Sequence, residues 1–201
     1  MSNKRGSLHF ADYPQYSIRI EQLKSAFKVL YALFDKIAYF LNSYFELGIH
    51  ERDVSFSHIW LTEFGTGKHH YNYKNTLNYQ NNVALASLFW ISRDFYDKFE
   101  DSPSPKLKRI SNVRNALEHK YVKVTNDWFL ERINGEIDDL ALYITEDELS
   151  ELTMSLLHIV REAIISLSLC IHSEEQKKKD ENENKFIMPV VLMEYDDDWK
   201  V

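Results

Sequence analysis

The stretch Arg114-Asn115-Ala116-Leu117-Glu118-His119-Lys120-Tyr121 ends an amphipathic segment that begins at about residue 106. An α-helix turns about 100° per residue, so side chains at alternating spacings of three and four lie along one stripe. Within this segment the stripe consists of Leu107, Ile110, Arg114, Leu117 and Tyr121. A guanidinium on an apolar stripe costs several kcal/mol unless it is paired, and Arg114 therefore indicates a functional site.

Asn115 and His119 are four residues apart and share a neighbouring face of the predicted helix. Each candidate site residue also has a structural alternative. Arg114 and Glu118 have the i, i+4 spacing of a helix salt bridge, and His119 lies where a residue complements the helix dipole. Three charged residues interrupt apolar helical stretches elsewhere and are candidate neighbours of Arg114, although they also suit ordinary salt bridges: Asp35, Arg93 and Asp94.

Written as R-N-x-x-x-H-x-Y, the stretch resembles the motif of the HEPN superfamily, whose ribonuclease members carry R-x-x-x-x-H with a polar residue after the arginine. The resemblance implies an all-α fold, an antiparallel helical bundle. The motif covers eight residues, and its position at the end of a short helix in a chain of 201 residues supports the resemblance. The additional tyrosine resembles the subset of HEPN toxins that are paired with nucleotidyltransferase antitoxins.

The sequence before the motif predicts two long helices. Residues 17–47 alternate apolar spacings of four and three, with Ser17 as the N-cap and Gly48 as the left-handed C-terminal stop. Residues 49–75 are polar and aromatic, which predicts a long loop with one helical turn near Phe56 to Trp60. A second long helix is expected over about 76–100.

Pro105 can start the motif helix, which is expected over about 106–121. After it, residues 122–125 and 140–144 are rich in β-branched and aromatic residues and predict two short strands, a small β-hairpin-like insertion on the bundle. Thr145-Glu146-Asp147-Glu148 is a capping box that opens the last helix, expected over about 146–176.

A single HEPN-like domain is predicted over residues 1–201, because no repeat and no second domain boundary is found. Three segments are expected to lie outside the bundle: an N-terminal arm (1–16), a charged flexible segment (173–185) and a docking tail (186–201).

The composition is that of a globular protein, with 44% hydrophobic and 27% charged residues. One cysteine excludes an internal disulfide, and neither a signal peptide nor an uncharged apolar stretch of about 18 residues is found, so we expect a cytoplasmic protein without a membrane role. The net charge of −7 conflicts with RNA binding, which usually requires a basic surface. Positive charge is nevertheless concentrated around the motif, where Lys108, Lys120 and Lys123 are candidates for RNA binding.

The motif predicts RNA cleavage without a metal or a cofactor, by attack of the ribose 2′-hydroxyl on the adjacent phosphorus. An imidazole suits proton transfer near neutral pH, and a guanidinium offers a planar pair of donors to phosphate oxygens. We therefore expect His119 as general acid or base, Arg114 as the stabiliser of phosphate charge, and Asn115 as the residue that orients His119 or the phosphate. The resemblance implies a homodimer with a composite active site, because one histidine cannot easily perform both proton transfers.

Tyr121 is a candidate for modification or for support of the site. In the HEPN toxins that this stretch resembles, a nucleotidyltransferase antitoxin adenylylates that tyrosine, whereas its place on the apolar stripe equally predicts a buried aromatic. The resemblance implies a toxin or anti-phage defence nuclease. The alternatives are a non-catalytic HEPN-like module that binds nucleotide, RNA or protein, and a motif helix that serves only packing.

Overall fold

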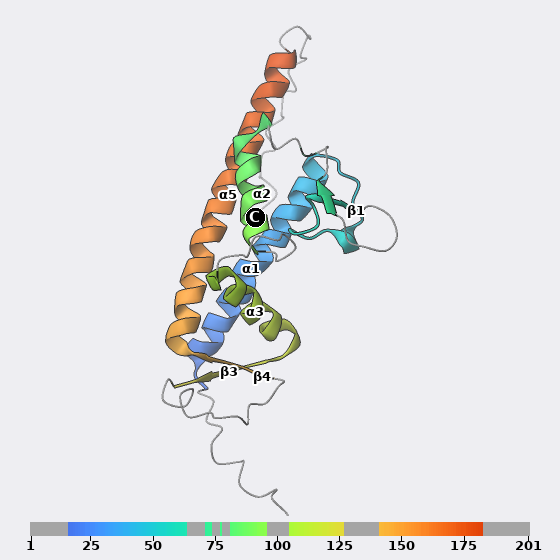
Figure 1. Ribbon diagram of the computed structural model, residues 1–201. Coiled ribbons are helices and arrows are strands. Elements are labelled where there is room, and N and C mark those ends of the chain that lie inside the picture. Colours follow the sequence, from blue (N-terminus) through green and yellow to red (C-terminus); the bar gives the residue numbers. More distant parts are fainter. Residues whose placement is uncertain are drawn as a thin grey trace, which may run out of the picture.

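The computed structural model describes residues 16–63, 71–73, 77, 81–95, 105–126 and 141–182. Four α-helices build the described part of the fold (Figure 1): α1 (Ile18–Tyr44), α2 (Val83–Phe95), α3 (Pro105–His119) and α5 (Glu146–Asn182). A short 3-10 helix, η2 (Glu51–Asp53), follows α1. Two pairs of short strands complete the described elements: β1 (Leu61–Glu63) with β2 (Tyr71–Tyr73), and β3 (Tyr121–Thr125) with β4 (Ala141–Thr145). The predicted all-α bundle with a small β insertion is therefore confirmed.

The long helix α5 runs along the whole length of the bundle, and both α1 and α2 pack against it (Figure 1). Arg19 pairs with Glu146 where α1 and α5 begin, and Tyr44 donates a hydrogen bond to Glu175 near their other ends. These two helices therefore run in the same direction, and α2 is the antiparallel neighbour of both. The chain returns to the base of the bundle through α3 and the β3–β4 pair before α5 begins.

The core consists of apolar side chains from all four α-helices and from the segment after η2. Its centre is aromatic, because the Phe34 ring lies 5.1 Å from the rings of both Phe56 and Phe95. Two hydrogen bonds fix the backbone of Phe56 next to this cluster. Its amide donates to Asp35 Oδ1 (3.2 Å) and its carbonyl accepts from Ser92 Oγ (2.8 Å). The segment after η2 is thus an integral part of the core.

The beginning of α1 is as predicted, but its end is not. The Ser17 hydroxyl accepts a hydrogen bond from the Ile20 amide, as expected of an N-cap. The helix ends in a Schellman motif, in which the Leu47 amide donates to Asn42 O and the Glu46 amide donates to Ser43 O. Glu46, with φ of 49°, takes the left-handed position that the sequence assigns to Gly48.

Helix α2 begins at Val83, later than the expected start near residue 76. The buried Asn82 accounts for this start, because its Oδ1 accepts from the Leu85 amide while its Nδ2 donates to Cys170 O and to Glu174. One amide side chain thus caps α2 and fastens it to α5. The expected extension of the helix to residue 100 lies outside the described residues. The long loop expected over 49–75 contains the antiparallel β1–β2 pair, which the sequence did not predict.

The β3 and β4 strands pair in parallel, so the hairpin-like arrangement is corrected. The two strands are separated by residues 126–140. A connection of that length suits a parallel crossover, whereas hairpins use turns of two to five residues. Thr145 ends β4 and caps α5 at once, since its Oγ1 accepts from the Glu148 amide. The N-cap bond of the predicted capping box is therefore present, whereas the Glu148 carboxylate accepts hydrogen bonds from Arg109.

Helix α5 continues to Asn182, so residues 173–182 of the predicted flexible segment are helical. Their charged side chains pair within the helix, Lys177 with Glu174 and Lys178 with Glu175. The remaining residues of that segment, the expected docking tail and residues 1–15 of the expected arm lie outside the described residues. By length and composition α5 could also cross a membrane, but one of its faces supplies Leu149, Leu156 and Ala163 to the core.

Candidate functional site

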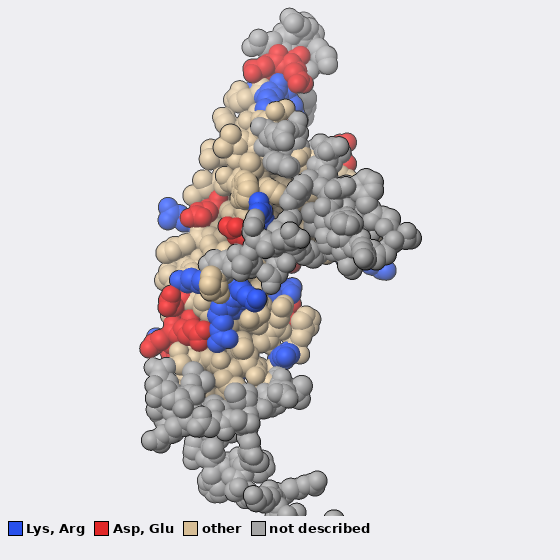
Figure 2. Space-filling model, in the orientation of Figure 1, with Lys and Arg blue, Asp and Glu red and all other residues tan. Residues whose placement is uncertain are grey.

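Helix α3 positions the motif, and its basic residues are partly neutralised by the beginning of α5 (Figure 2). The Arg109 guanidinium donates to both Glu148 oxygens, at 2.6 and 3.2 Å, and to Tyr143 O. Lys106 pairs with Glu151 at 2.8 Å, and this contact lowers the pKa of the Glu151 carboxyl. These bonds fix the orientation of α3. They also remove Lys106 and Arg109 from the positive charge available to a ligand.

Arg114 lies half-buried between α3 and α1, with 30% of its side chain exposed. Its guanidinium carbon stands 5.2 Å from the centre of the Tyr31 ring, a cation–π contact with a buried tyrosine of α1. Nη1 donates to Asn115 Oδ1 at 3.0 Å, and Nη2 pairs with Glu118 Oε2 at 3.0 Å. Its Nε is buried and has no hydrogen-bond partner among the residues that the structure describes. The guanidinium is therefore held by two neighbours of its own helix and by one aromatic ring.

None of the three charged residues considered as neighbours of Arg114 forms its ion pair in the described part of the chain. Asp35 binds the Phe56 amide, the Arg93 guanidinium lies 4.8 Å from the Trp90 ring, and Asp94 is exposed. The i, i+4 pair with Glu118 is present instead. A helix salt bridge and an anion-binding arginine are compatible readings of this contact, because a carboxylate on a guanidinium occupies the position of a phosphate.

His119 is the last residue of α3, and 72% of its side chain is exposed. Its Nε2 lies 3.7 Å from Glu118 Oε2, the same oxygen that binds Arg114. One carboxylate oxygen therefore stands between the guanidinium and the imidazole. A phosphate bound in place of this carboxylate would have Arg114 at its nonbridging oxygens and His119 next to it, an arrangement compatible with acid–base cleavage of a phosphodiester. The sequence identified Glu118 as a salt-bridge partner of Arg114 but not as the contact shared with His119.

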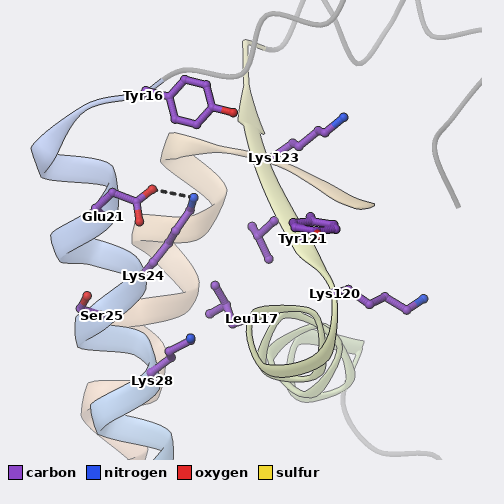
Figure 3. A pocket seen from close by; sticks show the side chains of 10 residues that line it. Tyr16, Glu21, Lys24, Ser25, Lys28, Leu117, Lys120, Tyr121 and Lys123 are labelled. Atoms are coloured by element: carbon purple, nitrogen blue, oxygen red, sulfur yellow. Dashed lines mark hydrogen bonds and ion pairs between the residues drawn. The ribbon is translucent and has the colours of Figure 1, made fainter. Parts of the chain in front are cut away.

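The expectation that Tyr121 belongs to the apolar stripe is wrong, because α3 ends at His119 and Tyr121 begins β3. The buried residues of α3 are Ile110, Val113 and Ala116, and 69% of Tyr121 is exposed. Its side chain lines an open groove between α3–β3 and α1 (Figure 3).

The structure separates the three lysines expected to bind RNA. Lys120 and Lys123 line the groove beside Tyr121, and Lys123 Nζ also lies 5.5 Å from the Tyr143 ring. Lys108 is exposed on α3 away from that groove. The groove also contains Lys24 and Lys28 of α1, which sequence reasoning missed.

The signal for the two missed lysines is their spacing. Lys24, Lys28 and Tyr31 follow at i, i+4 and i+7 on the predicted first helix and therefore share one face. That this face meets α3 is a property of the packing. For metal binding, no cluster of three or more His, Cys, Asp or Glu side chains that could hold an ion occurs among the residues that the structure describes.

A helical bundle that presents R-N-x-x-x-H at the end of a short helix defines a HEPN domain. The chain belongs to the LA2681-like HEPN family, whose sequence pattern matches residues 2–174. No curated protein and no solved structure matches the chain. HEPN domains generally bind RNA and are often ribonucleases, so the family supports either a nuclease or a HEPN-like binding module.

Proposed function

We propose that this protein is a metal-independent endoribonuclease. The observation that carries the proposal is the single Glu118 oxygen, 3.0 Å from Arg114 Nη2 and 3.7 Å from His119 Nε2. A phosphate group of RNA takes the place of that carboxylate. Arg114 then binds the nonbridging oxygens and stabilises the charge that develops on them, with Asn115 holding the guanidinium in place.

The reaction transfers two protons. The ribose 2′-oxygen attacks the adjacent phosphorus while its proton passes to the neutral imidazole of one His119. The bond to the 5′-oxygen breaks, and that oxygen receives a proton from a second acid. The products are a 2′,3′-cyclic phosphate and a free 5′-hydroxyl. Such general acid–base catalysis typically contributes about 10²–10⁴-fold to the rate.

The second acid in this proposal is His119 of another protomer, in a homodimer with a composite active site. The exposure of His119 at the end of α3 is compatible with such a cleft. Two motif helices would also bring two sets of lysines together, which would raise the local positive charge of a chain with net charge −7.

The experiment is cleavage of a labelled RNA by the purified protein in excess EDTA. We expect wild type to cut and to leave cyclic phosphate ends. Arg114→Ala and His119→Ala should each lose at least about 100-fold in rate. Asn115→Ala should lose less, and Asn112→Ala is its matched control, because Asn112 is exposed on the same helix. The fold of each variant is verified by circular dichroism.

The second candidate is a HEPN-like module that binds RNA or nucleotide without cutting it. The pairing of Arg114 with Glu118 supports this candidate as well, because a guanidinium that holds a carboxylate can bind a phosphate without any proton transfer. RNA binding that depends on Arg114, with no cleavage by wild type, would establish the module and refute the nuclease.

The proposed biological setting is a toxin or an anti-phage defence nuclease under the control of a nucleotidyltransferase-type antitoxin. The support is Tyr121, whose exposed side chain lies in the groove next to Lys120. Transfer of AMP to this hydroxyl would fill the groove with a nucleotide. Intact mass spectrometry of protein purified from its own host, beside Tyr121→Phe, tests for the added AMP, and unmodified wild-type protein would contradict the proposal.

A further inference from the structure

An open groove of about 340 Å³ lies between the N-terminal half of α1 and the junction of α3 with β3 (Figure 3). Four lysines and two tyrosines line it: Lys24, Lys28, Lys120, Lys123, Tyr16 and Tyr121. Its volume is at the lower end of the range of ligand pockets, about 300–1,000 Å³. The groove is thus of a size for a nucleotide and is too small to enclose a duplex.

Positive charge dominates this groove, although the whole protein is acidic. Glu21 is the acidic residue in its lining, and it pairs with Lys24 at 2.8 Å. The Lys24 side chain is 16% exposed and Glu21 is 59% exposed, so a phosphate binds Lys24 by displacing the more exposed Glu21 carboxylate. Lys28 is exposed and makes no ion pair within the described part of the chain, so its charge is available to a ligand.

The lysines of α1 lead to the motif. Lys24, Lys28 and Tyr31 share one face of α1, at intervals of about 6 Å and 4.5 Å along the helix axis. Tyr31 carries the Arg114 guanidinium on its ring. Three cationic groups, Lys24, Lys28 and Arg114, therefore follow one another from the groove to the candidate site.

Aromatic side chains complete the groove. Tyr121 stands between Lys120 and Lys123 on β3, and the Tyr16 ring lies at the far end with its hydroxyl directed toward β3 (Figure 3). Both rings are largely exposed, Tyr16 at 81%. Exposed rings beside a row of lysines are the arrangement that single-stranded nucleic acids use, with bases stacked on rings and phosphates on cations.

We propose that this groove binds the strand of single-stranded RNA that leads into the Arg114 site, with consecutive phosphates at Lys28 and Lys24 and a base on Tyr121. This inference rests on the proposed function, because it assigns the groove to the substrate of the same site. It adds two residues of α1 to the RNA-binding surface. It also selects single strands over duplexes as ligand.

The experiment measures binding of a fluorescent single-stranded RNA whose 2′-oxygens are methylated, so that it cannot be cleaved. Fluorescence anisotropy of the full chain gives the dissociation constant at a series of salt concentrations. Each lost phosphate contact reduces the slope of log affinity against log salt by about 0.7 for single strands. We expect this reduction for Lys28→Gln and about twice as much for Lys24→Gln/Lys28→Gln. Lys36→Gln, exposed on the same helix outside the groove, is the matched control and should keep the wild-type slope.

The stacking contact has its own pair of variants. Tyr121→Ala should weaken binding about tenfold, whereas Tyr121→Phe retains the ring and should bind as wild type does. The proposed role of the groove would be overturned by either of two results. One is an equal salt-dependence slope for Lys28→Gln and Lys36→Gln, and the other is equal affinity for single strands and duplexes. If the groove fails in this way while Arg114→Ala still abolishes cleavage, the nuclease stands. If Lys28→Gln weakens binding while wild type does not cleave, the groove stands and the nuclease fails.

Discussion

At the scale of single residues, Glu118 occupies the position at which a phosphate would contact Arg114 and His119. Its Oε2 binds Arg114 and lies near His119, so RNA must displace it before both groups can contact a phosphate. A half-exposed pair of this kind contributes about 0.2–1 kcal/mol. The carboxylate is therefore a weak competitor of the substrate, and it keeps the guanidinium paired while no ligand is bound.

Glu118→Gln is expected to lower KM for RNA about two- to fivefold and to leave kcat unchanged, because the substrate no longer displaces a carboxylate. Steady-state cleavage kinetics provide the measurement. Glu162→Gln removes the same charge at an exposed position of α5 and serves as the control. A rise in KM would show that Glu118 positions Arg114 for the substrate and does not compete with it.

The residues of this site differ in how far the sequence could place them. The direction of Arg114 follows from helical periodicity, and the side chain does lie against α1. Predicting the position of the Tyr121 side chain requires knowing the residue at which α3 ends, and periodicity alone does not locate that residue. Predicting that Lys24 and Lys28 line the groove requires knowing how α1 packs on α3. That packing depends on side chains that are far apart in the chain. Local patterns therefore predicted the motif but not the surface around it.

At the scale of elements, the ends of the helices show which local signals are sufficient. Ser17 and Thr145 cap α1 and α5 as the sequence predicts, because an N-cap needs only a hydroxyl three residues before an amide. The C-terminal stop is less local. The Asn42 side chain exchanges two hydrogen bonds with the Ile49 backbone beyond the end of α1, and the left-handed residue is Glu46, although Gly48 is near.

This stop predicts opposite effects for two substitutions. Glu46→Gly removes about 1–2 kcal/mol of strain from the left-handed backbone of the folded state. It also increases the conformational entropy of the unfolded chain, which lowers the stability by about 0.4–1 kcal/mol. The net expectation is a protein more stable by about 0.5–1 kcal/mol. Gly48→Ala should be less stable by a similar amount, because Gly48 has φ of 68°, although the space around it is open. Thermal unfolding measures both, and a lower melting temperature for Glu46→Gly would contradict the strain argument.

The strand pair illustrates a limit of prediction at the same scale. The composition of residues 122–125 and 140–144 indicated strands, and strands form there. Their relative direction depends on the path of the residues between them. Strand propensities do not predict that path. The positions of both strands were therefore predicted correctly, whereas the hairpin-like pairing was wrong.

At the scale of the whole molecule, the arrangement of the bundle places the motif at its surface. The shared direction of α1 and α5 requires the chain to return to the base, and the antiparallel α2, followed by α3 with β3 and β4, makes this return. The motif therefore lies at the end of a short helix on the outside of the bundle, where His119 is open to a second molecule. An exposed histidine at this position accounts for how one small domain could share a site with its copy.

Mixed dimers test whether the site is shared. A dimer with Arg114→Ala in one chain and His119→Ala in the other keeps one arginine and one histidine, on different chains. The matched dimer pairs wild type with the double variant and keeps the same two residues on one chain. If the cleft is composite, we expect both dimers to lose at least about 100-fold in rate, because each lacks one of the two histidines that transfer protons at the shared phosphate. Differently tagged chains, co-expressed and purified through both tags, allow the comparison in excess EDTA. If each protomer cuts alone, the matched dimer keeps about half of the wild-type rate and the first dimer keeps none, so the activity of the matched dimer is the deciding measurement.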